Sequence, residues 1–171
     1  MFIHQLFEQK PFVFSLEIFP PKKKNGNIRS VYQTIEALLK VQPDFISVTF
    51  GAGGNLADNS TCEIASAIKK NYGVESVAHL TCVNSSKEDV HVMLERLHQS
   101  GVENILALRG DINPDVPPKK DFLYAADLVR VIREDGRFGI SGACYPEGHS
   151  QAPDMETDIL HLKEKVDAGV S

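Results

Sequence analysis

Short apolar runs rich in β-branched and aromatic residues alternate along this chain with longer segments of helical periodicity. Five strand-then-helix units follow one another, with no linker between them. Strands are predicted at 12–19, 44–50, 75–83, 103–110 and 137–145, and helices at 28–41, from near Asp58 onward, and at 88–101, 122–134 and 158–170. Several strand runs are apolar nearly throughout, as expected when both faces of a parallel strand are buried. The sequence therefore predicts an α/β fold around a parallel sheet.

Glycines at the ends of the helical segments support these boundaries. Gly73, Gly101, Gly136 and Gly169 each follow a helical stretch. A left-handed residue commonly closes a helix, and glycine adopts that conformation without steric cost. The two Pro- and Lys-rich stretches, PPKKKNGN and NPDVPPKKD, each lie between a strand and a helix, and we interpret them as βα loops.

Two architectures share this rhythm, the open doubly wound sheet and the closed TIM (β/α)8 barrel. Polar residues lie at or just beyond the carboxyl ends of five different predicted strands: Glu17, Thr49, His79, Arg109 with Asp111, and Tyr145. A barrel draws ligand groups from every strand, whereas a doubly wound sheet draws them mainly from one switch point, so we favour the barrel. Since a closed barrel typically needs about 250 residues, we expect residues 1–171 to be its first five βα units, the N-terminal portion of a single barrel domain truncated at the C-terminus.

Composition argues against several classes of function. The formal net charge of −5 is spread along the chain, so no basic face for nucleic acid is predicted. The first apolar stretch contains a Glu and a Lys and lacks a small-residue cleavage site, which argues against a signal peptide or a membrane span. Cys62, Cys82 and Cys144 are widely spaced, which suggests neither a disulfide framework nor a zinc site. We expect a cytoplasmic protein without nucleic-acid or membrane partners.

Glu17 is the candidate for acid chemistry. It stands alone in the apolar run SLEIFPP, ahead of two prolines that end the strand. In a largely apolar cavity its pKa would rise by desolvation, leaving a carboxyl that can donate a proton near neutral pH. The structural alternative, equally weighted on residue type, is a Glu at the barrel rim paired with a lysine.

The other candidates have structural alternatives too. Thr49 precedes the glycine-rich GAGGN, which lacks the third glycine of a dinucleotide fingerprint; on residue type alone, an ordinary βα turn is the favoured interpretation. Arg109 and Asp111 could form a mutual ion pair, and a lone strand residue such as His79 is more often a satisfied core histidine. Tyr145 has the ring to stack on a ligand and the hydroxyl to hydrogen-bond it.

Two further groups of residues offer weaker signals. His91, Glu95 and His98 have a spacing that could hold a metal, but we interpret them as a solvated helix face and predict no metal site. The run of lysines at 22–24 is interpreted as a solvated loop, with a basic rim for an acidic ligand as the alternative.

The motifs SLEIFPPK, ISVTFGAGG, AHLTC, ALRGD, ACYPEGH and LKEKVDAG follow one another in this order. With them, the chain resembles the bacterial methylenetetrahydrofolate reductase family from about Phe12 to Val170. The resemblance implies a flavin-dependent oxidoreductase of one-carbon metabolism and methionine biosynthesis. Its reaction would reduce 5,10-methylenetetrahydrofolate to 5-methyltetrahydrofolate with NAD(P)H, by ping-pong hydride transfer through FAD.

The resemblance also implies roles for individual residues. Glu17 matches the general acid that protonates the folate so that its five-membered ring opens to an iminium cation. Asp111 matches an acidic residue near the flavin and the pterin, where its charge would stabilise that cation. The other residues that match FAD contacts are Thr49, His79, Arg109, Tyr145, His149, Asp158 and Lys165. The family's pterin-binding glutamine and its stacking aromatic residue would lie beyond Ser171.

Two other hypotheses remain open. One is a truncated, non-catalytic half-barrel that binds FAD weakly or not at all and self-associates, since open sheet edges and an exposed interior invite association. The other is a different flavin barrel, such as a proline dehydrogenase relative, although the contexts of Glu17 and Asp111 argue against it. Folate and NAD(P)H are the expected small-molecule partners, and we expect a homo-oligomer.

Overall fold

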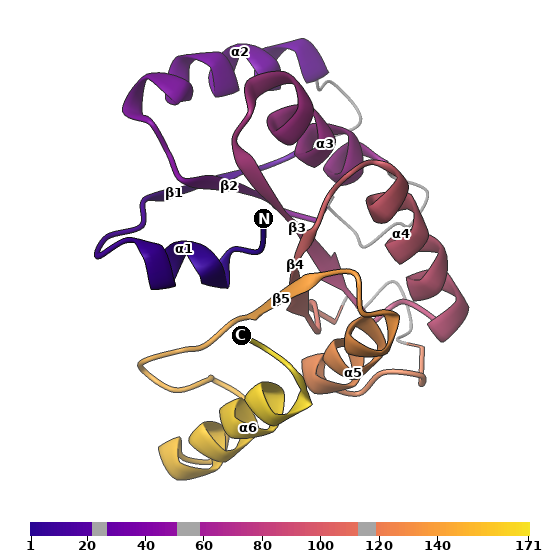
Figure 1. The fold of residues 1–171 in the computed structure, drawn as a ribbon. Helices are drawn as coiled ribbons and strands as arrows, with labels where there is room; N and C mark the ends of the chain where they lie inside the picture. The colour runs from indigo at the N-terminus through magenta and orange to yellow at the C-terminus, as the bar shows by residue number, and fades with distance from the viewer. Residues whose placement is uncertain (22–26, 51–58, 113–118) are drawn as a thin grey trace.

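A five-stranded parallel sheet forms the centre of the protein. The computed structural model describes residues 1–21, 27–50, 59–112 and 119–171 (Figure 1). The strands are β1 (Ser15–Ile18), β2 (Phe45–Val48), β3 (Glu75–Thr81), β4 (Asn104–Leu108) and β5 (Gly139–Gly142). Their order in space is β1-β2-β3-β4-β5, so each strand pairs with its neighbour in the sequence and the order never reverses. This sequential order is that of a barrel wall, and the prediction of a barrel over a doubly wound sheet is confirmed.

Helices follow the strands along the outside of the curved sheet (Figure 1). They are α2 (Ile28–Leu38), extended by the short 3-10 helix η1 (Leu39–Val41), then α3 (Ser60–Tyr72), α4 (Lys87–Gln99), α5 (Ala125–Asp135) and α6 (Met155–Ala168). All five predicted strand-then-helix units are therefore present. No helix in the described parts of the chain combines the length and the apolar character that crossing a bilayer requires.

The helix ends follow local signals in the sequence. Gly73, Gly101, Gly136 and Gly169 all have positive φ, as predicted for residues that close helices. At the other end of α4, the Ser86 hydroxyl accepts from the Asp89 backbone N–H while the Asp89 carboxylate accepts from the Ser86 N–H. This reciprocal capping satisfies two backbone donors that the helix itself leaves unpaired.

The two faces of the sheet have different environments. Ile46, Leu80 and Ile105 point toward the helices and are fully buried in the main hydrophobic core. Residues of the opposite alternation point to the concave side, which would be the interior of a closed barrel. Glu17 and Ser47, which are register partners on β1 and β2, belong to this second set.

A short N-terminal helix covers the lower end of the concave side. Helix α1 (His4–Gln9) lies across the sheet from the outer helices (Figure 1). Ile3 and Leu6 pack against Val77 in a second, smaller cluster. The sequence did not predict α1, because a six-residue segment carries little periodicity and this helix has no side-chain cap at its amino end.

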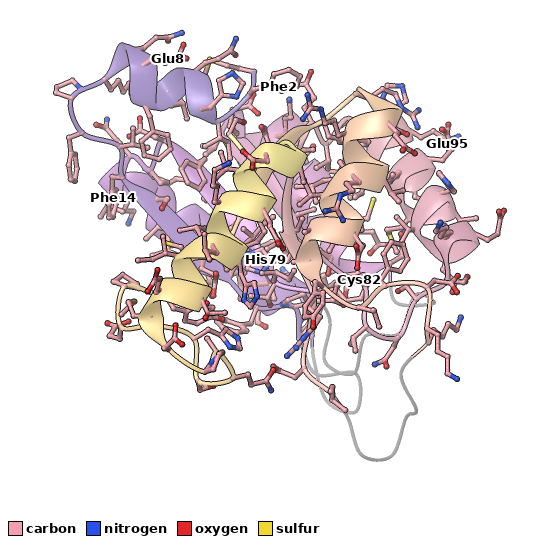
Figure 2. All side chains as sticks on the ribbon, turned by 90° about the horizontal axis from the view of Figure 1, so that it is seen from below. Phe2, Glu8, Phe14, His79, Cys82 and Glu95 are labelled. Atoms are coloured by element: carbon pink, nitrogen blue, oxygen red, sulfur yellow. The ribbon has the colours of Figure 1, made fainter. Side chains whose placement is uncertain are left out.

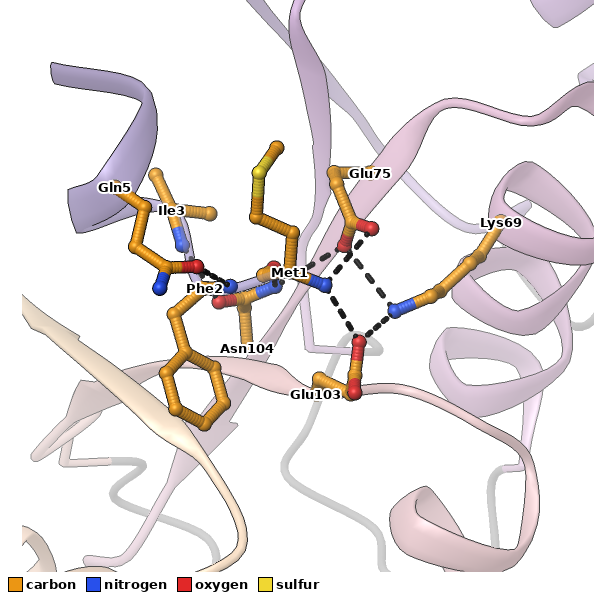
Figure 3. Close-up of polar contacts among 8 residues, drawn as sticks. All are labelled: Met1, Phe2, Ile3, Gln5, Lys69, Glu75, Glu103 and Asn104. Atoms are coloured by element: carbon orange, nitrogen blue, oxygen red, sulfur yellow. Dashed lines mark hydrogen bonds and ion pairs between the residues drawn. The ribbon is translucent and has the colours of Figure 1, made fainter. Parts of the chain in front are cut away.

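Polar contacts fix this segment to the amino ends of β3 and β4 (Figure 3). The buried Asn104 accepts a hydrogen bond from the Ile3 N–H at 2.9 Å. Lys69 forms ion pairs with Glu75, at 3.2 Å, and with Glu103. The Lys69 hydrogen bond holds the pKa of Glu103 down at about 2. These contacts lie at the bottom of the barrel wall, where residues usually serve stability rather than ligand binding.

Candidate active site

A cavity of about 570 Å³ opens at the carboxyl ends of the strands. Its walls come from β3, from the segments that follow β2, β4 and β5, and from α6. Seven of the nine residues singled out from the sequence line it: Thr49, His79, Arg109, Asp111, Tyr145, His149 and Lys165. The volume lies within the range of roughly 300–1,000 Å³ that is typical of small-molecule sites. The fold thus brings together residues that are far apart in the sequence.

Asp158 lies in a smaller neighbouring cavity of about 220 Å³ between α6 and the segment that follows β5. Tyr145, His149 and Lys165 line both cavities, so the two adjoin along the same three side chains. The Asp158 carboxylate accepts a hydrogen bond from the His149 backbone N–H at 2.9 Å, which ties α6 to the loop before it. Together the two cavities suit an elongated ligand.

Glu17 does not line either cavity, and its surroundings differ from the sequence expectation. Its side chain is 47% exposed, and in the described part of the chain β1 lies at the edge of the sheet, beside β2. One carboxylate oxygen, Oε2, lies 3.5 Å from both the Ser47 hydroxyl and the His79 imidazole. The expected apolar enclosure is therefore wrong for the described residues, among which the neighbours of Glu17 are a serine and a histidine. The alternative of a lysine partner stays a prediction, since the lysines at 22–24 lie outside the described residues.

His79 is buried on the concave side, with 7% of its side chain exposed. In Figure 2, which shows the molecule from below, it lies near the middle of the structure, whereas Glu8 and Glu95 lie at the periphery. Burial lowers the pKa of the imidazole, and the nearby Glu17 charge opposes this effect. Its Nε2 atom has no hydrogen-bond partner in the described residues, although Glu17 lies at ion-pair distance. His79 is therefore not the satisfied core histidine of the structural alternative.

Thr49 directly follows β2 and is held in place through its backbone. Its N–H donates to the Ile18 carbonyl at 3.0 Å, and its own carbonyl accepts from the Thr61 hydroxyl at 2.9 Å. These contacts leave the Thr49 side chain at the wall of the cavity. The glycine-rich stretch 51–55 and the lysines at 22–24 lie outside the described residues.

Arg109 and Asp111 follow β4 through a sharp turn at Gly110. Gly110 has φ +84°, and a Cβ at this position would lie 3.0 Å from Thr81 Cβ. The Arg109 guanidinium donates to Gln151 Oε1 at 2.8 Å. No ion pair of the described chain joins Arg109 to Asp111, so the predicted alternative of a mutual pair is wrong there. Asp111 is exposed at the cavity wall.

The segment between β5 and α6 supplies the aromatic and basic part of the wall. The rings of Tyr145 and His149 meet edge to face, with centroids 4.9 Å apart. Lys165 is half-buried and donates to the Ala143 carbonyl, which distinguishes it from an ordinary exposed helix lysine. His149 Nδ1 accepts from the Gln151 N–H at 3.1 Å.

Sequence reasoning missed three residues that contribute to this site. Ser47 contacts Glu17, Thr81 lines the cavity against Gly110, and Gln151 holds Arg109. Ser47 had a detectable signal, since it is a polar residue within an apolar strand. Gln151 had none, because its role depends on a loop whose path the sequence does not specify.

The charges of the site are separated in space. Basic or ionisable nitrogen atoms line the cavity at Arg109, His149 and Lys165. These side chains suit an anionic group such as a phosphate. Asp111 supplies a negative charge at the wall, and Glu17 lies beyond it on β1. His91, Glu95 and His98 lie elsewhere, on the exposed face of α4, where Glu95 accepts from Arg137 and Gln99.

The fold and this site define a protein of the βα-barrel class with a cavity at the carboxyl ends of the strands. Solved structures with the same fold include 2,3-dimethylmalate lyase (TM-score 0.63, 14% identity, 98% of this chain and 59% of that chain). Phosphoenolpyruvate phosphomutase from Streptomyces platensis subsp. rosaceus is similar in fold (TM-score 0.62, 12% identity, 98% of this chain and 60% of that chain). At these identities the likeness concerns the fold alone.

The chain belongs to the methylenetetrahydrofolate reductase family, whose model matches residues 2–171. The 5,10-methylenetetrahydrofolate reductase of Buchnera aphidicola is 40% identical over 158 residues, covering 92% of this chain and 52% of the relative. That of Escherichia coli is 37% identical over 157 residues, covering 92% and 52%. Methylenetetrahydrofolate reductase 1 of Schizosaccharomyces pombe is 40% identical over 173 residues, covering 98% of this chain and 28% of the relative. The chain spans about half the length of the bacterial relatives.

Proposed function

We propose that this chain carries the FAD-binding part of a reductase that converts 5,10-methylenetetrahydrofolate to 5-methyltetrahydrofolate with NAD(P)H, by ping-pong transfer. One observation supports this above all. Seven residues that match FAD contacts of the family, scattered from position 49 to position 165, line a single cavity. Bound FAD would supply the hydride relay between the nicotinamide and the folate. We further propose that the protein is cytoplasmic.

The described residues fit such a cofactor. Lys165 and Arg109 would hold its phosphates, since both are cations on one cavity. Tyr145 and His149 would flank the chain between phosphates and ring, and Asp158 would bind the adenosine half in the adjoining cavity. Thr49 and His79 line the end of the cavity nearer to Glu17.

Two carboxylates would serve the chemistry of the folate. Glu17 would donate a proton to the folate nitrogen, which opens the five-membered ring to a cation. The Asp111 charge at the cavity wall would stabilise that cation and would disfavour negative charge on the ring of the reduced flavin. The site would thus combine a proton donor on β1 with an electrostatic group after β4.

Flavin retention tests the cofactor proposal. The purified chain is incubated with FAD and desalted, and its visible absorption spectrum is recorded. We expect retained flavin bands, and we expect Lys165→Met to weaken binding by about tenfold or more, since a charge-assisted hydrogen bond contributes roughly 1.5–3 kcal/mol. Lys163→Met is the matched control, because Lys163 lies on the same helix but is 66% exposed and pairs with Asp167. A colourless wild-type protein, or equal loss in both variants, would contradict the site.

The acid role of Glu17 is tested by separating the two half-reactions. We expect Glu17→Gln to preserve flavin reduction by the nicotinamide, measured as NADH oxidation with menadione, while slowing folate reduction. Glu8→Gln, on the remote helix α1, is the control. Equal loss of both half-reactions in Glu17→Gln would argue against a proton-donor role.

We also propose that residues 1–171 form the N-terminal portion of one barrel domain. Two features support this. Ser171 N–H donates to the Ile140 carbonyl at 3.0 Å, along the free edge of β5. Met155, Ile159 and Val166 expose apolar side chains on α6. Further βα units, supplied by a longer chain, would cover these surfaces.

A self-associating half-barrel is the alternative that the same exposed surfaces favour. Light scattering distinguishes the two. A concentration-dependent rise in mass without flavin binding would support the half-barrel, whereas a defined homo-oligomer that retains flavin would support the reductase.

A further inference from the structure

Three polar side chains from three neighbouring strands meet on the concave side of the sheet. Glu17 on β1 and Ser47 on β2 are register partners, and His79 lies one strand further, on β3. The same atom, Glu17 Oε2, lies 3.5 Å from Ser47 Oγ and 3.5 Å from His79 Nε2. Both neighbours therefore approach the same oxygen of the carboxyl group.

His79 has the character of a neutral hydrogen-bond donor. It is buried, and its Nε2 has no hydrogen-bond partner in the described residues, although the Glu17 carboxylate lies 3.5 Å away. Desolvation lowers the pKa of the imidazole, which favours the uncharged form at neutral pH. A buried ring nitrogen without a partner is costly, and a separation of 3.5 Å needs only a small movement to become a hydrogen bond.

We propose that His79, together with Ser47, positions the Glu17 carboxyl group for proton transfer. In this arrangement Nε2–H of the neutral imidazole and the Ser47 hydroxyl both donate to Oε2, so the transferable proton resides on Oε1. Glu17 gives that proton to the substrate nitrogen and becomes a carboxylate, while His79 keeps its own proton throughout. This inference rests on the acid role proposed for Glu17 above.

The neutral state of His79 matters for this role. An imidazolium at the same distance would favour the ionised carboxylate and make Glu17 a poorer proton donor. The other titratable groups that line the cavity with His79 are Arg109, Asp111, Tyr145, His149 and Lys165. Burial lowers the pKa of His79, and the charge of Glu17 opposes this effect. Catalytic hydrogen bonds are often long in the free protein and shorten when substrate binds.

A direct test measures the imidazole rather than turnover. Nitrogen-15 NMR of the histidine rings is recorded across a pH titration, in the wild-type chain and in Glu17→Gln. We expect the His79 tautomer with the proton on Nε2, and a lower His79 pKa in Glu17→Gln, because the variant removes a negative charge that favours the imidazolium. His91, exposed on α4, is the internal control, and its ring signals should not differ between the two proteins. An Nδ1–H tautomer, or an unchanged His79 titration, would overturn the inference.

A second test uses Ser47→Ala, which removes one donor to Oε2. We expect folate reduction to fall by about tenfold with a displaced pH profile, as for a misplaced general acid. NADH oxidation with menadione serves as the internal reference, and an equal fall in both reactions would contradict a positioning role. If the chain binds no flavin, the proposed function fails, but the NMR comparison still decides whether His79 and Glu17 are coupled.

Discussion

Replacing Asn104 with alanine should release the N-terminal segment from the bottom of the sheet. Asn104 is 1% exposed and makes three hydrogen bonds. Its Oδ1 accepts from the Ile3 N–H at 2.9 Å, and its Nδ2 donates to the Met1 carbonyl at 3.1 Å and to Glu75 Oε2 at 3.3 Å. A typical intramolecular hydrogen bond contributes about 0.5–1.5 kcal/mol, so the three together suggest a loss of about 2–4 kcal/mol.

The loss in stability cannot exceed the free energy with which α1 docks on the sheet. Ile3 and Leu6 are each about 5% exposed and pack against Val77. Burying such a side chain contributes roughly 1.5–3 kcal/mol, so docking of the two is worth about 3–6 kcal/mol at most. Once α1 detaches, its backbone groups are hydrated, and the substitution causes no further loss in the free energy of unfolding. The expected decrease in the free energy of unfolding is therefore about 2–4 kcal/mol.

Urea unfolding at neutral pH measures this decrease, and hydrogen exchange at the amides of residues 3–10 localises it. Asn71→Ala is the matched control, because Asn71 is an exposed residue near the end of α3. A loss for Asn104→Ala below about 0.5 kcal/mol, the usual range of surface substitutions, would refute the reasoning. Unchanged exchange at Leu6 would refute the detachment of α1.

Three other perturbations have defined outcomes. Gly110→Ala should destabilise the protein by about 1–3 kcal/mol and weaken flavin retention, because φ is +84° and the new Cβ would meet Thr81; thermal melting and the desalting assay check this. Stability should fall as the pH drops below about 6.5, since the unfolded chain protonates His79 more readily than the folded one; urea unfolding at several pH values should show a smaller dependence in His79→Gln. The hydrogen bond from Lys119 lowers the pKa of Asp89 from 3.8 to about 2. The ionised Asp89 therefore stabilises the fold above pH 3.8, and this contribution is lost as the pH falls from 3.8 to about 2. Asp89→Asn should make stability depend less on pH between these values, as measured by acid unfolding.

Local signals in the sequence were sufficient for the βα architecture. Apolar runs gave the five strands, and glycines such as Gly73 and Gly136 gave the helix ends, because a left-handed cap is a requirement of the backbone itself. The barrel order was also predictable, since polar residues at the ends of successive strands indicated a site assembled from all of them. The helix predicted at 28–41 differs slightly from the observed one, because α2 ends at Leu38 and the short 3-10 helix η1 follows it.

The candidate site was predictable only as a set of residue types, not as a set of contacts. Thr49, Arg109 and Lys165 follow different elements, and their meeting at one cavity depends on how strands and helices pack. Gln151 shows the limit most clearly, since its bond to Arg109 joins two loops that are 42 residues apart. Such pairings depend on loop paths, for which no periodicity in the sequence gives information.

By itself, the sequence determined the five βα units and their order, and it indicated candidate residues for the site, because periodicity, capping and residue type are local properties of the chain. Tertiary structure alone decided that α1 folds, that Asn104 anchors it, and that Glu17 is half exposed beside His79. The physical reason is the same in each case. Burial, desolvation and hydrogen-bond partners are set by atoms that are distant in the sequence, and only packing brings those atoms together.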